Sequence, residues 1–150
     1  MEEPTTASAI ISFVEKLENN SSKFYEDLAE RYAESRETFL AFAKESKKNK
    51  VLVTRTYQET ITDAIEACFS FRGLNLSDYL AETTLTEDTS YSSALKMAIE
   101  LEEKASKFYL DVAEQSKSLL ATIPRAFKIV AEIRNNRKLK LKSLVDKLKY

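Results

Sequence analysis

The sequence predicts an all-α fold, a four-helix bundle made of two similar helix pairs. The chain of 150 residues contains one glycine and two prolines, far fewer turn-forming residues than a β-sandwich or an α/β fold requires. Alanine, leucine, glutamate and lysine, which favour helix, are abundant. The motif L-E-x-x-x-S-K-F-Y occurs twice, at residues 17–25 and 101–109. The length predicts one domain over residues 1–150.

Two helices are predicted in the first half, over residues 6–35 and 36–71. Thr5 or Thr6 is the expected N-cap of the first helix. In both helices apolar residues recur at intervals of three and four, the period of a helix with one buried face. Glu18 falls inside this apolar stripe rather than beside it. We therefore expect a carboxylate in the core of the bundle.

Two further helices are predicted in the second half, over residues 92–115 and from Ala121 or Pro124 to 149. Proline suits the first turn of a helix, because its missing N–H needs no partner there. Glu102 again occupies a core position, 84 residues after Glu18. The second helix pair thus repeats the pattern of the first.

A connection over residues 72–91 separates the helix pair at 6–71 from the pair at 92–149. Gly73 and a threonine-rich run break the helical pattern, although 76–80 is expected to form a short helix. About twenty residues can cross the length of a bundle, at roughly 3.3 Å per residue. We expect this stretch to be a crossover between the two halves.

The second helix of each pair places polar residues on its inner face. In the first pair these are Ser46 and Asn49, midway along the helix. Arg134 and Arg137 take the corresponding positions 88 residues later. Glu45 is turned about 100° away from this inner face and is not expected to reach the core.

A tyrosine follows each repeated glutamate after seven residues, Tyr25 after Glu18 and Tyr109 after Glu102. This pattern resembles the ferritin-like superfamily, and within it the rubrerythrin-like proteins. The resemblance extends over residues 10–148. It implies a ferritin-like four-helix bundle with an internal repeat and a long crossover between the second and third helices.

The second helix of each half usually carries the pattern A-x-x-E-x-x-H in that family. Here the segments read A-K-E-S-K-K-N at 43–49 and A-E-I-R-N-N-R at 131–137. Serine and arginine replace the two glutamates, and asparagine and arginine replace the two histidines. The chain contains no histidine, which excludes Ser-His-Asp and Cys-His catalysis and histidine-containing metal sets. The resemblance therefore implies a degenerate di-iron site.

Two interpretations of Glu18 and Glu102 stay open. As residual metal ligands, they are the candidates for holding iron or manganese, the metals that the family resemblance implies. However, Arg134 and Arg137 add two positive charges to the two negative ones, so neutrality needs no metal. Our hypothesis is that guanidinium groups replace the metals as partners of the carboxylates, and that no cofactor is bound.

Other candidate residues have structural interpretations. Tyr25 and Tyr109 are expected to pack in the core with a hydrogen bond each, in preference to radical or metal-supporting chemistry. Ser46 and Asn49 complete the expected polar layer of the core. Cys68 stands alone in an apolar helical context, so we expect a buried thiol and no disulfide.

Composition and charge exclude several functions. The net charge of −1 gives no overall attraction to nucleic acid or an anionic membrane. One glycine cannot form a phosphate-cradling loop. No apolar run approaches the length of a membrane span, and the N-terminus lacks a basic leader, so the expected compartment is the cytoplasm.

Three functions are considered. We favour a non-catalytic bundle that acts by binding or assembly, and the resemblance implies a homodimer. The first alternative is an atypical metal-binding protein or oxidoreductase that uses Glu18 and Glu102. The second is binding of nucleic acid or lipid through the basic run 134–142 of the last helix. The two arginines of that run are expected to point inward, which weakens the second alternative.

Overall fold

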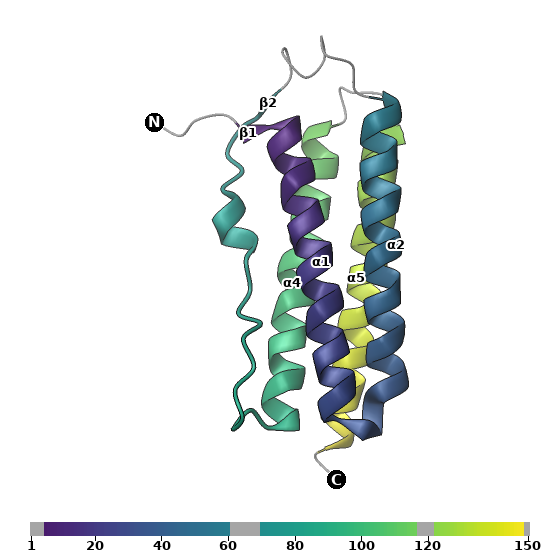
Figure 1. The fold of residues 1–150 in the computed structure, drawn as a ribbon. Coiled ribbons are helices and arrows are strands. Elements are labelled where there is room, and N and C mark those ends of the chain that lie inside the picture. Colours follow the sequence, from purple (N-terminus) through teal and green to yellow (C-terminus); the bar gives the residue numbers. More distant parts are fainter. Residues whose placement is uncertain (1–4, 61–69, 117–121, 149–150) are drawn as a thin grey trace.

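The computed structural model describes residues 5–60, 70–116 and 122–148. Within them, four long α-helices run side by side along one axis (Figure 1): α1 (Ala7–Arg31), α2 (Arg36–Thr60), α4 (Tyr91–Gln115) and α5 (Thr122–Lys147). Helices α1 and α5 run in one direction, and α2 and α4 run in the other. The predicted all-α, four-helix bundle is confirmed. Cys68 lies outside the described residues.

Helices α1 and α4 begin at side-chain caps. The Thr6 hydroxyl accepts a hydrogen bond from Ala9 N (3.1 Å), and the Ser90 hydroxyl accepts one from Ser93 N (3.0 Å). Of the two threonines expected at the start of α1, Thr6 is therefore the N-cap, while the Thr5 hydroxyl donates to a backbone carbonyl of the connecting segment. Each cap satisfies an N–H that the first helical turn leaves unpaired.

Two helix ends differ from those predicted. Helix α1 ends at Arg31, and a 3₁₀ turn, η1 (Ala33–Ser35), leads into α2. The helix predicted over 36–71 was too long, because Ser70–Phe71 forms a short strand, β2, antiparallel to β1 (Thr5–Thr6). Pairing with the N-terminal strand and burial of the Phe71 ring override the local helical pattern there.

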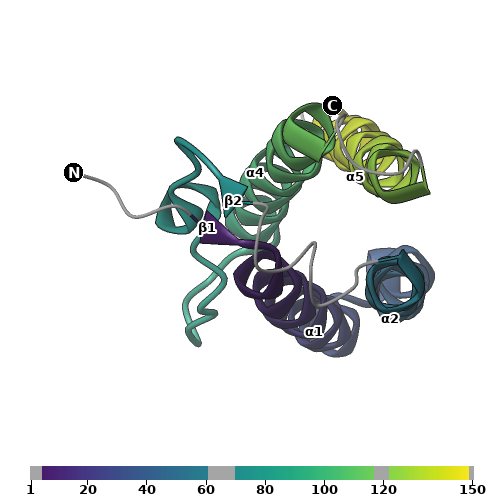
Figure 2. The same cartoon turned by 90° about the horizontal axis from the view of Figure 1, so that it is seen from above.

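The connection between the halves extends along the bundle from β2 to the start of α4 (Figure 1). It contains a 3₁₀ turn, η2 (Leu76–Tyr79), where a short helix was predicted. The Tyr79 hydroxyl donates to the Asp111 carboxylate (2.7 Å), and the Arg31 guanidinium donates to the Thr86 carbonyl oxygen (2.6 Å). The connection therefore covers the side of the bundle that α1 and α4 form (Figure 2).

Aromatic rings fill much of the core. Phe13 of α1 packs on Phe108 of α4, with 4.7 Å between ring centroids, and Tyr25 of α1 lies edge-on to Phe42 of α2 at 5.2 Å. In the described part of the chain, no helix has the length and apolar character to cross a membrane. Midway along the helices, apolar packing gives way to a layer of buried polar and charged side chains.

Removal of the α4 cap should weaken the fold. Ser90→Ala takes away the acceptor of the Ser93 N–H, so we expect the free energy of unfolding to fall by about 1 kcal/mol. The control is Ser92→Ala in the same turn, which should change it by less than about 0.5 kcal/mol. Equal losses for the two variants in urea unfolding would contradict the capping role of Ser90.

Candidate functional site

The six polar residues predicted for the core meet in one layer across the bundle. Helices α1 and α4 contribute a glutamate each, α2 a serine and an asparagine, and α5 two arginines: Glu18, Glu102, Ser46, Asn49, Arg134 and Arg137. None of these residues has more than 2% of its surface exposed. The burial of these six side chains agrees with their helical spacing in the sequence.

Arg134 lies between the two glutamates. Its Nη1 donates to both carboxylate oxygens of Glu102 (2.7 and 2.6 Å), and its Nη2 donates to Oε1 of Glu18 (2.7 Å) and also to Oε2. Nη2 further donates to the Ser21 hydroxyl (3.0 Å). One planar guanidinium thus bonds all four carboxylate oxygens and joins three helices. Charge-assisted hydrogen bonds of this kind are strong and directional.

Arg137 occupies the neighbouring turn of α5 and reaches toward α2. Its Nη1 donates to the Ser46 hydroxyl (2.9 Å) and to Oε1 of Glu102 (3.1 Å). Its guanidinium also lies over the rings of Tyr25 and Phe42, with 5.8 and 5.4 Å from Cζ to the ring centroids. The flat cation is therefore held by hydrogen bonds at its edge and by aromatic faces.

Glu45 contacts this site from its rim, and it lies off the inner face of α2 as the sequence predicted. Its Oε1 accepts a hydrogen bond from Nε of Arg137 (2.7 Å), although the Glu45 side chain is 40% exposed. The helical geometry does turn Glu45 off the inner face of α2. However, the arginine side chain is long enough to meet the carboxylate at the rim of the layer.

Two neutral side chains support the pairing of Glu18 with Arg134, one at each partner. Asn49 Nδ2 donates to Oε1 of Glu18 (3.2 Å), so a side-chain amide serves as a further donor to this carboxylate. Ser21 accepts from Arg134 and donates to the Leu17 carbonyl oxygen (2.6 Å). Ser21 was missed as a site residue, although it follows Glu18 by three positions, the spacing of neighbours on one helix face.

The charges of the layer balance, and Arg134 stays protonated. Burial alone would lower the pKa of its guanidinium, but the charges of Glu102 and Glu18 outweigh burial and raise that pKa well above its ordinary value. Two buried carboxylates and two buried guanidinium groups cancel in charge. Glu45, at the rim, adds a further negative charge next to Arg137.

Tyr25 and Tyr109 flank the layer from opposite halves of the chain. Burial first, and then the charge of Glu102, raises the pKa of Tyr25 well above its ordinary value. Burial and then the charge of Glu18 have the same effect on the pKa of Tyr109. Each hydroxyl lies close enough to a glutamate for that carboxylate to raise its pKa, but among the described residues neither makes a hydrogen bond of good geometry.

The layer does not fit a di-iron centre. Such a centre needs about four carboxylates and two imidazoles around two metals. Here all four oxygens of the core carboxylates already accept hydrogen bonds from a cation. In the described ranges, no group of three or more aspartate, glutamate, histidine or cysteine side chains is placed to hold a metal ion. The arrangement can instead neutralise and orient its own carboxylates.

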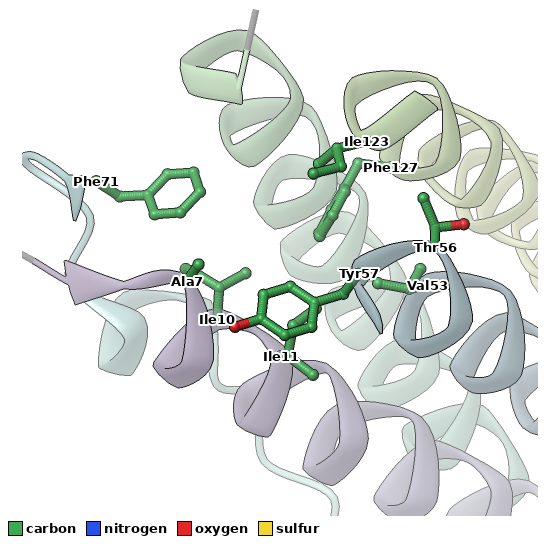
Figure 3. Close-up of a pocket in the computed structure, with 9 residues that line it drawn as sticks. All are labelled: Ala7, Ile10, Ile11, Val53, Thr56, Tyr57, Phe71, Ile123 and Phe127. Carbon is green, nitrogen blue, oxygen red and sulfur yellow. The ribbon is translucent and has the colours of Figure 1, made fainter. Parts of the chain in front are cut away.

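A small apolar pocket lies at one end of the bundle, apart from the charged layer (Figure 3). Its volume is about 20 Å³, enough for one water molecule at most. Tyr57 of α2 lies across it and makes a hydrogen bond of 3.2 Å with Ser8 of α1. The lining is almost wholly apolar, so we regard this pocket as a packing gap and the charged layer as the candidate site.

Comparisons with known proteins give no relative for this chain: no family model, no curated protein and no solved structure matches it. The ferritin-like resemblance therefore depends on the residue pattern that carries it. The geometry of the buried layer is the main source of evidence on function.

Loss of the bridging guanidinium should be severely destabilising. Arg134→Ala leaves two buried carboxylates without their shared cation, and we expect a loss of roughly 3–5 kcal/mol in the free energy of unfolding. Arg125→Ala, an exposed arginine on the same helix, is the control and should cost less than about 0.5 kcal/mol. If Arg134→Ala and Glu102→Ala both leave thermal stability unchanged, the buried ion pair is not stabilising.

The two buried tyrosines should make the fold sensitive to alkali. Their pKa values are raised in the folded state, so the folded protein retains protons that the unfolded chain loses near pH 10. The contribution of the two protonated tyrosines to the free energy of unfolding is therefore fully present below about pH 10, and it decreases as the pH rises further. The double variant Tyr25→Phe, Tyr109→Phe should lose stability less steeply in unfolding measurements above pH 10. Parallel pH curves for the variant and the parent protein would contradict this.

Proposed function

We propose that this chain is a rubrerythrin-like member of the ferritin-like superfamily that has exchanged its metals for an internal cation and acts by binding or assembly. The single observation that carries the proposal is the position of Arg134. Its guanidinium lies between Glu18 and Glu102, the two residues that match the family's glutamates. On this view the chain is not an enzyme, and its buried site has a structural role.

The arrangement of the chain supports the ferritin-like part of the proposal. The two glutamates lie on α1 and α4, and their partners lie on α2 and α5, as an internal repeat of helix pairs requires. The connection that extends along the bundle between α2 and α4 is consistent with the long crossover of that topology. Ser46 and Arg134 stand at equivalent places in the two pairs.

Electrostatics supports the loss of metal. A charge placed in a dry core is costly unless a counter-charge and hydrogen bonds compensate it. The two buried glutamates are already compensated by Arg134 and Arg137. A divalent cation added to this layer would leave two uncompensated positive charges, so metal binding would first require Arg134 to move out of the core.

The proposal includes a homodimer, which the family resemblance implies, and a location in the cytoplasm. The first alternative is an atypical metal-binding protein or oxidoreductase using Glu18 and Glu102, with iron or manganese as cofactor. It needs the same carboxylate oxygens that Arg134 holds. Metal content therefore separates the two proposals directly.

Metal analysis tests this function. Protein purified without chelators should contain far less than one iron or manganese per chain, and added Mn²⁺ should leave its thermal midpoint unchanged. Arg134→Ala removes the guanidinium that holds the two glutamates, so Mn²⁺ should raise the thermal midpoint of this variant. At a hundred-fold excess of Mn²⁺ over its Kd, the free energy of unfolding should rise by up to about 2.7 kcal/mol. Arg125→Ala is the matched control and should not respond. Stoichiometric metal in the parent protein would overturn the proposal.

A further inference from the structure

The surface charges of this protein are divided between two sides of the bundle. Helices α2 and α5 lie together on one side, and α1, α4 and the connection lie on the other (Figure 2). Outside the buried layer, α2 and α5 carry twelve basic and five acidic side chains, a net charge of +7. The described residues of the other side carry thirteen acidic and seven basic side chains, a net charge of −6. The overall charge of −1 hides this separation.

The basic side is also the uncovered side. The connection packs against α1 and α4, where Lys104 donates to the Leu80 carbonyl oxygen (2.8 Å) and Tyr79 donates to Asp111 (2.7 Å). In the described part of the chain, no further element lies over the outer surfaces of α2 and α5 (Figure 2). Their outer surfaces, here called the α2–α5 face, extend over helices about 37 Å long, at 1.5 Å per residue.

Aliphatic side chains are interspersed with the lysines of the α2–α5 face. Leu40 and Leu139 are 48% and 56% exposed. Five of the eight large hydrophobic side chains that are exposed in the described residues belong to these two helices: Leu40, Val51, Leu52, Ile129 and Leu139. Nine of the twelve basic residues are lysines. The face thus combines flexible cations with exposed apolar groups.

We propose that the α2–α5 face docks on an anionic phospholipid surface. Lysine ammonium groups are attracted to anionic headgroups, and aliphatic side chains between them can enter the boundary with the acyl chains. The charge separation would orient the molecule, with the acidic side directed away from the lipid. This inference builds on the proposed binding role, but it does not depend on the metal content of the core.

The composition of the face favours lipid over other anionic partners. Single-stranded nucleic acid is usually bound with aromatic stacking platforms, and base edges are read largely by arginine forks. A second copy of the chain could offer its acidic side. Within one chain, however, Glu26 and Glu103 of that side already pair with Lys47 (3.0 Å) and Lys142 (3.8 Å) of the α2–α5 face. Neither partner matches both the lysines and the exposed leucines as a lipid surface does.

Vesicle co-sedimentation of the full chain tests the proposal. The probes are phosphatidylcholine vesicles with roughly one third phosphatidylserine, and pure phosphatidylcholine vesicles as the neutral control. We expect binding to the anionic vesicles only, with loss of binding as salt rises from about 0.1 to 0.5 M. Equal binding to both kinds of vesicle, or binding to neither, would overturn the proposal.

Matched variants locate the binding surface. Lys44→Gln, Lys48→Gln and Lys140→Gln together remove three exposed lysines from the α2–α5 face. Each lysine near the lipid surface should raise the affinity for anionic vesicles about five-fold, so the triple variant should bind them roughly 100-fold more weakly. The control removes three exposed lysines of α1 and α4, Lys16, Lys23 and Lys96, so it has the same net charge and should bind like the parent protein. Equal weakening of the two triple variants would contradict docking through this face.

The apolar part of the face and the rival partners need their own measurements. Leu40→Ser with Leu139→Ser keeps every charge, and it should weaken binding to anionic vesicles several-fold. Tight, salt-dependent binding to a DNA fragment without vesicle binding would assign the face to nucleic acid. Salt-dependent self-association in sedimentation velocity, abolished in the lysine variant, would assign it to a second copy. Either result overturns the lipid proposal and leaves the metal analysis unaffected.

Discussion

The guanidinium of Arg134 is the contact on which the interior of this bundle depends. It bonds both oxygens of Glu18 and both of Glu102, and so links α1, α4 and α5 at their midpoints. Because both carboxylates and the guanidinium are buried, removing any one of these three charges leaves an unpaired charge in the core, which is costly. The pairing also opposes alternative registers, since sliding any one helix by a turn would place a charge against apolar side chains.

The surroundings of the layer strengthen this pairing. Aromatic rings of Tyr25 and Phe42 cover Arg137, and Tyr109 lies on the other half of the site. A surrounding of low polarity makes each ion pair stronger than it would be in water and makes each unpaired group more costly. The raised pKa values of both tyrosines have the same origin, because burial disfavours the phenolate and the charge of a nearby glutamate adds to this effect.

Charged side chains are arranged differently on the exterior of the bundle than in its core. Inside, positive and negative charges are paired within one layer. Outside, basic side chains predominate on α2 and α5 and acidic ones on the opposite side, although Lys47 and Lys142 pair across to Glu26 and Glu103. The connection adds four acidic side chains to the side of α1 and α4, while most lysines of α2 and α5 are exposed. The core is thus internally neutral, whereas the surface charge is unevenly distributed.

The sequence by itself determined the four helices, apart from some of their ends, and most side chains of the buried layer. Helical period is a local property, so the positions of Glu18, Glu102 and Arg134 inside apolar stripes could be read from spacing alone. Only the tertiary structure decided that one guanidinium serves both glutamates, that Glu45 reaches Arg137 from the rim, and that Ser70–Phe71 pairs with the N-terminal strand. These outcomes depend on side-chain reach and on contacts between distant segments. Likewise, each helix has its own charge in the sequence, but packing alone places α2 beside α5 and gathers their lysines on one face.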